Sequence, residues 1–198
     1  MNRQTTALVP GSLSALSQRD NCTLAESFLN VDAILIVDMS GSMGAHDAPG
    51  GKSRYEAAED ELRALQERFP GKIAVVAFSH IAEFCPTGIP RRIGETTNLA
   101  GALRFVKAAD GLVKTINGIE IKMRFVIISD GEPDSEAEAL DVASEFESRI
   151  DCVYIGPEFG NGRDFLERLA EISGGTYSKS KAPGLLAENV TLLLTATA

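Results

Sequence analysis

The sequence predicts an α/β fold of the Rossmann-like, doubly wound kind, with a mostly parallel sheet of about six strands and helices on both faces. Short apolar runs of strand length alternate along the chain with longer stretches of helical period. Two of these runs, at 33–37 and 124–129, are apolar almost throughout, as expected for central strands buried on both faces. A very short link between two further runs predicts one antiparallel strand at the edge.

The composition is that of one folded domain. The chain has 198 residues, of which 44% are hydrophobic, and this is enough for a substantial core. Its formal net charge of −9 disfavours binding to nucleic acid. Three scattered cysteines do not make a disulfide framework, and with two histidines and no Cys-x-x-Cys pair a zinc site is not expected. We see no signal peptide and no membrane-length apolar run, so we expect a cytoplasmic protein without membrane contact.

The N-terminal part differs from the rest. Residues 1–30 are polar and weakly periodic, and we expect an N-terminal arm with a short helix near 23–29, followed by a domain at 31–198. The first strand of this domain occupies 32–37. The loop at 45–52 after it contains Pro and Gly residues and is a candidate for a partner-contacting surface.

A helix is expected from Ser53, because Ser53 and Glu56 have the spacing of a capping box. Pro70-Gly71 ends it. Its buried face is marked by apolar residues at helical spacing, namely Tyr55, Ala58, Leu62, Leu65 and Phe69.

The two runs after this helix form a hairpin. Strands at 72–78 and 81–85 are separated only by Ser79-His80. A parallel crossover needs a dozen or more residues, so these two strands must pair antiparallel. The second strand is short and is expected at the edge of the sheet.

Helices and strands continue to alternate in the second half of the chain. The capping box that starts one of these helices is formed by Ser135 and Glu138. The expected elements are a helix at 99–106, a strand at 124–129, a helix at 135–149, a strand at 150–155, a helix at 164–172, a strand at 176–178 and a last helix at 185–194.

Oxygen-bearing side chains follow two of the apolar strands. Asp38, Ser40 and Ser42 come directly after the first strand, and Asp130 follows a later one. Open α/β sheets bind ligands beyond the carboxyl ends of their strands, where the strand order reverses. If the two strands are neighbours there, both carboxylates face one crevice, and Thr97 could bring a third hydroxyl from the loop before the next helix. Hard cations such as Mg²⁺ favour oxygen ligands of this kind.

Three motifs resemble those of the von Willebrand factor type A family. Asp38-Met39-Ser40-Gly41-Ser42 resembles its Asp-x-Ser-x-Ser motif, Thr97-Asn98-Leu99 its threonine loop and Ser129-Asp130-Gly131 its aspartate loop. The motifs occur in the family order, and the similarity covers roughly residues 31–195. The sequence is similar to intracellular bacterial or phage members with an intact metal-ion-dependent adhesion site. The resemblance implies the sheet order 3-2-1-4-5-6.

The resemblance also implies a function. Ser40, Ser42 and Thr97 would contact a Mg²⁺ ion, with Mn²⁺ or Ca²⁺ as alternatives, while Asp38 and Asp130 would act mainly through bridging water. A protein partner would supply an Asp or Glu carboxylate at the open coordination position. The implied protein is a metal-dependent protein-binding module and not an enzyme. Similar small proteins act as adaptors in intracellular complexes, in some cases with AAA-type ATPases.

Further acidic residues surround these motifs. Glu95 stands where the family usually has a small residue before the threonine loop, and it either adds negative charge near the ion or points outward. Glu132 and Asp134 follow Asp130, and we interpret both as solvated loop residues. The preferred cation therefore stays open.

Other classes of function also stay open from the residues alone. Ser42 could be the nucleophile of a hydrolase, although the next helix does not start at once and neither histidine follows a strand suitably. Asp38 could be the nucleophile of a phosphotransferase, although Ser40 stands where a second acid is wanted. A third alternative is a scaffold whose metal site is vestigial. A nucleotide-binding domain is not expected, because the sequence has neither a Gly-x-Gly-x-x-Gly motif nor a P-loop.

Overall fold

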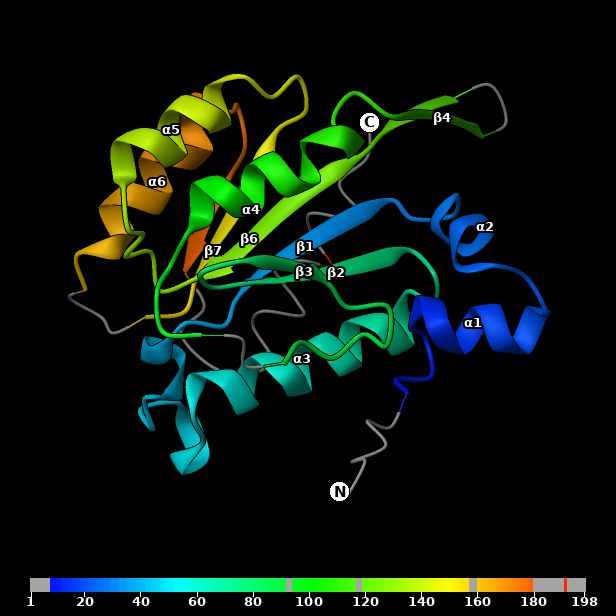
Figure 1. Cartoon of the computed structure of the whole chain (residues 1–198), viewed down its shortest axis with the longest axis horizontal. Coiled ribbons are helices and arrows are strands. Elements are labelled where there is room, and N and C mark those ends of the chain that lie inside the picture. Colours follow the sequence, from blue (N-terminus) through cyan, green and yellow to red (C-terminus); the bar gives the residue numbers. More distant parts are fainter. Residues whose placement is uncertain (1–7, 92–93, 117–118, 157–159, 180–190, 192–198) are drawn as a thin grey trace.

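A computed structural model describes residues 8–91, 94–116, 119–156, 160–179 and 191. The main sheet has six strands in the order β3-β2-β1-β6-β7-β8. β3 pairs antiparallel with β2, and the other neighbours pair parallel. This confirms the predicted α/β architecture, strand order and antiparallel edge strand (Figure 1). The strands are β1 Ala33–Asp38, β2 Ile73–Phe78, β3 Ala82–Phe84, β6 Arg124–Ser129, β7 Ile150–Tyr154 and β8 Tyr177–Lys179.

Helices cover both faces of this sheet (Figure 1). Successive side chains of a strand point to opposite faces, and the two clusters of the core follow this rule. Ile34 and Ile36 of β1 belong to the cluster that includes residues of α4, α5 and α6, whereas Leu35 and Val37 belong to the cluster that includes residues of α3. The four helices are α3 Arg54–Arg68, α4 Leu99–Val106, α5 Glu136–Ser144 and α6 Gly162–Ile172.

The predicted capping boxes differ in completeness. At α3 the box is complete, because the Ser53 hydroxyl accepts from the Glu56 N–H (3.1 Å) and the Glu56 carboxylate accepts from the Ser53 N–H (2.8 Å). At α5 the Ser135 hydroxyl accepts from the Glu138 N–H (3.3 Å), which is half of the predicted box. Both helices therefore begin where the sequence predicts.

The N-terminal segment contains two helices that pack on the domain. The helix predicted near 23–29 is α2 (Leu24–Phe28), whereas α1 (Leu13–Asp20) was not predicted. Leu13 and Leu16 of α1 are buried. Just before α1, a Cβ on Gly11 would lie 1.7 Å from the carbonyl oxygen of Gln66 in α3. The chain can therefore approach α3 this closely only because residue 11 is a glycine.

Two features of the second half depart from the prediction. A hairpin of β4 (Val113–Ile116) and β5 (Ile119–Lys122) forms a separate two-stranded sheet that was not predicted. The helix expected at 135–149 ends at Ser144, because the Asp110 carboxylate accepts from the N–H groups of Glu147 and Ser148 (2.9 Å each) and holds them outside the helix. The helix predicted at 185–194 lies, except for residue 191, outside the described residues.

The reversal of strand order lies between β1 and β6. The chain passes from β1 to β2 and β3 on one side and returns at β6 on the other side of β1. Val37 of β1 pairs with Ile128 of β6, so the two strands end at the same edge of the sheet. Asp38 is the last residue of β1, and Asp130 directly follows β6. The topology thus places both carboxylates where open α/β sheets bind ligands.

Candidate metal centre

Asp38 is held in a fixed orientation inside the protein. Its side chain is fully buried. One carboxylate oxygen accepts from the Ser40 N–H (2.9 Å), and the other accepts from the Ser129 hydroxyl (2.6 Å). The first bond closes an Asx-turn that leads the chain out of β1 into the short 3-10 helix Gly41–Gly44. Asp38 therefore fixes both the loop after β1 and the end of β6.

The two serines of the first loop bring their hydroxyls together. The Oγ atoms of Ser40 and Ser42 lie 3.0 Å apart. Ser40 is buried, whereas Ser42 is exposed to solvent. Hydroxyl oxygens this close can both turn a lone pair toward one cation, and Ser42 leaves one side of that position open to solvent.

Thr97 lies in the loop before α4, and backbone hydrogen bonds join this loop to the other two. The Thr97 N–H donates to the Asp134 carboxylate (2.9 Å), and the Asp134 N–H donates to the Thr97 carbonyl (3.0 Å). The Gly41 N–H donates to the Glu95 carbonyl (3.4 Å). The hydroxyl of Thr97 takes no part in these backbone hydrogen bonds, and Thr97 is buried. The three predicted loops therefore form one connected group at the edge of the sheet.

Asp130 is bound to an arginine. Its Oδ2 accepts from Nη1 of Arg54 (2.9 Å), the first residue of α3. Nε and Nη2 of Arg54 donate to the two carboxylate oxygens of Asp47, in the loop at 45–52 (2.8 and 2.6 Å). The other oxygen of Asp130, Oδ1, is buried and has no hydrogen-bond partner among the described residues. A buried carboxylate oxygen without a donor is costly, so this atom is suited to a bound cation or its water.

The surroundings of Asp38 disfavour its ionised carboxylate. Burial raises the pKa of Asp38 to about 6, although the hydrogen bonds from Ser129 and Ser40 lower it, and the nearby charge of Asp130 raises it further. A divalent cation would stabilise the ionised form of Asp38. Without one, the ionised Asp38 is destabilising in the folded protein at neutral pH.

The side chains present fit a hard cation. Both acids and all three hydroxyls supply oxygen, and no group of three His, Cys, Asp or Glu side chains that could hold a metal occurs among the described residues. The candidate ligands are therefore three hydroxyls and two carboxylates. Such a set suits Mg²⁺, which keeps several waters as ligands, and does not suit zinc, which prefers nitrogen and sulfur ligands.

All five predicted ligands, Asp38, Ser40, Ser42, Thr97 and Asp130, lie at this edge of the sheet. That they bind a metal stays a prediction. Sequence reasoning missed three contributors, which are the Ser129 hydroxyl, the Arg54 guanidinium and the Asp134 carboxylate. Asp134 is exposed, as predicted, but its carboxylate also holds the threonine loop. Glu95 is exposed as well.

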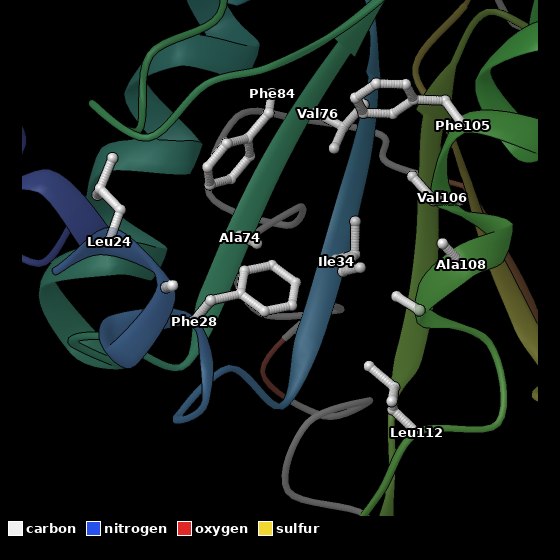
Figure 2. Close-up of a pocket in the computed structure, with 12 residues that line it drawn as sticks. Leu24, Phe28, Ile34, Ala74, Val76, Phe84, Phe105, Val106, Ala108 and Leu112 are labelled. Carbon is white, nitrogen blue, oxygen red and sulfur yellow. The ribbon is translucent and has the colours of Figure 1, made fainter.

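A second concave feature lies away from this centre. A groove of about 520 Å³ runs between α2 and α4, and its floor includes Ile34 of β1 and Val76 of β2 (Figure 2). All the residues that line it are apolar, and Phe28 and Phe84 form an edge-to-face pair on one side. Ile34 and Asp38 are four residues apart, about 13 Å along the strand. The groove therefore lies at the first half of β1, and the candidate metal centre lies at its carboxyl end.

Comparison with known proteins identifies the fold but not the function. The sequence matches no protein-family model and no curated protein. An aerotolerance-related membrane protein from Bacteroides fragilis superposes with a TM-score of 0.64 at 15% identity, over 84% of this chain and 100% of that one. BatB from Bacteroides thetaiotaomicron gives a TM-score of 0.59 at 16% identity, over 81% of this chain and 95% of that one. Among the described residues, no helix has the length and apolar character to cross a bilayer.

One similar structure carries the family name. A von Willebrand factor type A protein from Catenulispora acidiphila superposes with a TM-score of 0.59 at 19% identity, over 82% of this chain. The match spans 41% of that longer protein. Identities this low support an inference about architecture and not about activity. The chain has the fold of von Willebrand factor type A domains, a Rossmann-like α/β sheet with one antiparallel edge strand.

Proposed function

We propose that this protein is a metal-dependent protein-binding module that holds Mg²⁺ at the carboxyl edge of its sheet. In this proposal Ser40, Ser42 and Thr97 supply hydroxyl oxygens, and Asp38 and Asp130 orient the waters around the ion. The observation that carries the proposal is the buried Oδ1 of Asp130, which has no partner among the described residues and lies at the edge where Asp38 ends β1.

The arrangement of the chain's own residues suits a binding role. The hydroxyls are neutral, so they leave much of a cation's charge available for an incoming carboxylate. The bound ion would supply the electrostatic attraction for an Asp or Glu side chain of the partner. Ser42 is exposed, which leaves room for that side chain to approach. The loop at 45–52, fixed to the centre through Asp47 and Arg54, would form part of the contact surface.

A binding role is favoured over a hydrolytic one by the positions of the histidines. The Nδ1 atom of His46 lies 3.3 Å from the Gly51 carbonyl, and that of His80 lies 3.1 Å from the Ser79 hydroxyl. The Ser42 hydroxyl instead pairs with that of Ser40. A nucleophilic serine needs a base within hydrogen-bond reach, and these contacts do not supply one.

The proposal extends to the cellular role. We propose that the protein works inside the cell as an adaptor in a larger complex, with a complex built on an AAA-type ATPase as one candidate partner. This role follows from the family resemblance, and the exposed Ser42 would let one acidic side chain of the partner reach the ion.

The test uses Thr97→Val, which removes the hydroxyl but keeps the backbone N–H that donates to Asp134. Thr96→Val, at the exposed neighbour, is the matched control. We expect millimolar Mg²⁺ or Mn²⁺ to raise the melting temperature of the wild type and of Thr96→Val, and much less that of Thr97→Val. Affinity purification should recover a partner that is lost both with EDTA and with Thr97→Val. A wild-type melting temperature that metal leaves unchanged would refute the proposal.

A further inference from the structure

Arg54 places a permanent positive charge inside the candidate metal centre. Its side chain is only 11% exposed, and its guanidinium donates to Asp130 and to Asp47. The bond to Asp130 occupies Oδ2, one of the two oxygens that this carboxylate could offer to a metal ion or its waters. The arginine and a divalent ion would therefore share one carboxylate.

The position of Arg54 bears on the charge balance between the two buried acids. Asp38 and Asp130 are both buried, and each charge disfavours the other. The guanidinium offsets part of this repulsion from a distance of 2.9 Å. Asp47 binds the other edge of the guanidinium in a bidentate pair, which keeps its plane fixed beside Asp130.

We propose that Arg54 is a built-in counter-cation, which stabilises the metal-free centre and competes with the divalent ion for Asp130. This inference rests on the proposed function. The competition follows from linkage, because a contact that is stronger in the free protein than in the bound protein lowers the affinity for the ligand. Arg54 would then set the cation concentration at which the centre fills.

Removing Arg54 should change the affinity for the cation in a direction that distinguishes competition from positioning. If Arg54 only positioned Asp130, then removing it would weaken cation binding. If Arg54 competes, then Arg54→Gln binds the cation more tightly, because the substitution removes a like charge from the centre. Arg54→Lys keeps the charge but loses the bidentate pair with Asp47, so its affinity should lie between those of the wild type and Arg54→Gln. Arg63→Gln is the matched control, since it changes the net charge equally and, among the described residues, removes a pair with Glu59 on the same helix (2.9 Å).

The first measurement needs no metal. Urea unfolding in EDTA gives a double-mutant cycle of Arg54→Gln and Asp130→Asn. We expect Arg54→Gln to lower stability in the wild-type background and to have little effect when Asp130 is already asparagine. Equal effects in both backgrounds would overturn the proposal, because Arg54 would then stabilise the protein independently of Asp130.

The second measurement is Mn²⁺ affinity, from the electron paramagnetic resonance signal of the free ion. We expect Arg54→Gln to bind at least about fivefold more tightly than the wild type, the lower end of typical coupling between two ligands. Arg63→Gln should stay near the wild type, and Arg54→Lys should lie between the wild type and Arg54→Gln. If the wild type binds Mn²⁺ and Arg54→Gln binds equally or more weakly, this inference falls and the proposed function stands. If neither binds, the proposed function falls, and the competition falls with it.

Discussion

Replacing Asp38 by asparagine should make the metal-free protein more stable. The folded protein buries this carboxylate completely, and burial raises its pKa from 3.8 to about 6. At about 1.36 kcal/mol per pH unit, this difference corresponds to about 3 kcal/mol of unfavourable free energy in the folded state at pH 7. An asparagine can still accept from the Ser40 N–H and can donate to the Ser129 hydroxyl. We therefore expect Asp38→Asn to gain about 1–3 kcal/mol in EDTA.

The pH dependence of stability independently checks that Asp38→Asn stabilises the metal-free protein. Because the folded-state pKa of Asp38 is raised, the protonated acid favours folding below pH 3.8, and this contribution is lost as the pH rises through about 6. The advantage of Asp38→Asn over the wild type should thus shrink from its full value at pH 7 to about half at pH 5 and to a small remainder at pH 4.

The assay is urea unfolding in EDTA at pH 7, 5 and 4. Asp110→Asn is a control of opposite sign. Burial acts to raise the pKa of Asp110, but the N–H groups of Glu147 and Ser148 and the ammonium of Lys107 lower it on balance, so its loss should destabilise the protein at pH 7. The reasoning is refuted if Asp38→Asn is less stable than the wild type at pH 7, or if the difference does not change with pH.

Two further predictions concern the backbone that carries the centre. Ser53→Ala removes the hydroxyl that accepts from the Glu56 N–H and should lower the free energy of unfolding by about 1 kcal/mol, as measured with urea; an unchanged midpoint would contradict a role of the cap. Gly131→Ala should cost more than about 2 kcal/mol in thermal unfolding, because Gly131 has a φ of 77° and an added Cβ would lie 2.2 Å from the Gly162 carbonyl; a variant that melts like the wild type would contradict this geometry.

The main sheet could be predicted because its determinants are local. The two-residue link of Ser79 and His80 is too short for a crossover, so the antiparallel edge strand followed from chain length alone. The hairpin of β4 and β5 was missed even though the sequence carries Asn117-Gly118 between its strands, a common hairpin signal. Its strands are only four residues long, which is too short for the alternation to stand out.

The end of α5 could not be predicted, because a distant residue decides it. The local pattern continues to Arg149, but Asp110 accepts from the N–H groups of Glu147 and Ser148 and draws them out of the helix. Phe146 also packs its ring edge-to-face against Phe125 of β6, with 5.2 Å between centroids. Such contacts are specified by the folded chain and not by the segment itself.

The positions of the candidate ligands could be predicted from strand ends together with the family resemblance, whereas their supporting side chains could not. Asp38 and Asp130 each follow an apolar strand, and the sheet order that the resemblance implies makes these strands neighbours where the order reverses. Arg54, by contrast, is simply the first residue of a capped helix in the sequence, and its contact with Asp130 spans 76 positions. The bond from Ser129 to Asp38 spans 91 positions. Nothing periodic in the sequence marks such pairs.

The supporting side chains change how stability and binding should be related in this protein. The ionised Asp38 destabilises the metal-free fold, and Arg54 offsets part of the charge that the two acids bring together. Asp38→Asn and Arg54→Gln should therefore move metal-free stability in opposite directions, the first upward and the second downward. In both cases stability in EDTA and affinity for the cation should change with opposite sign. Such an inverse relation between stability and affinity is expected of a centre whose charged groups bind a ligand at some cost to the stability of the fold.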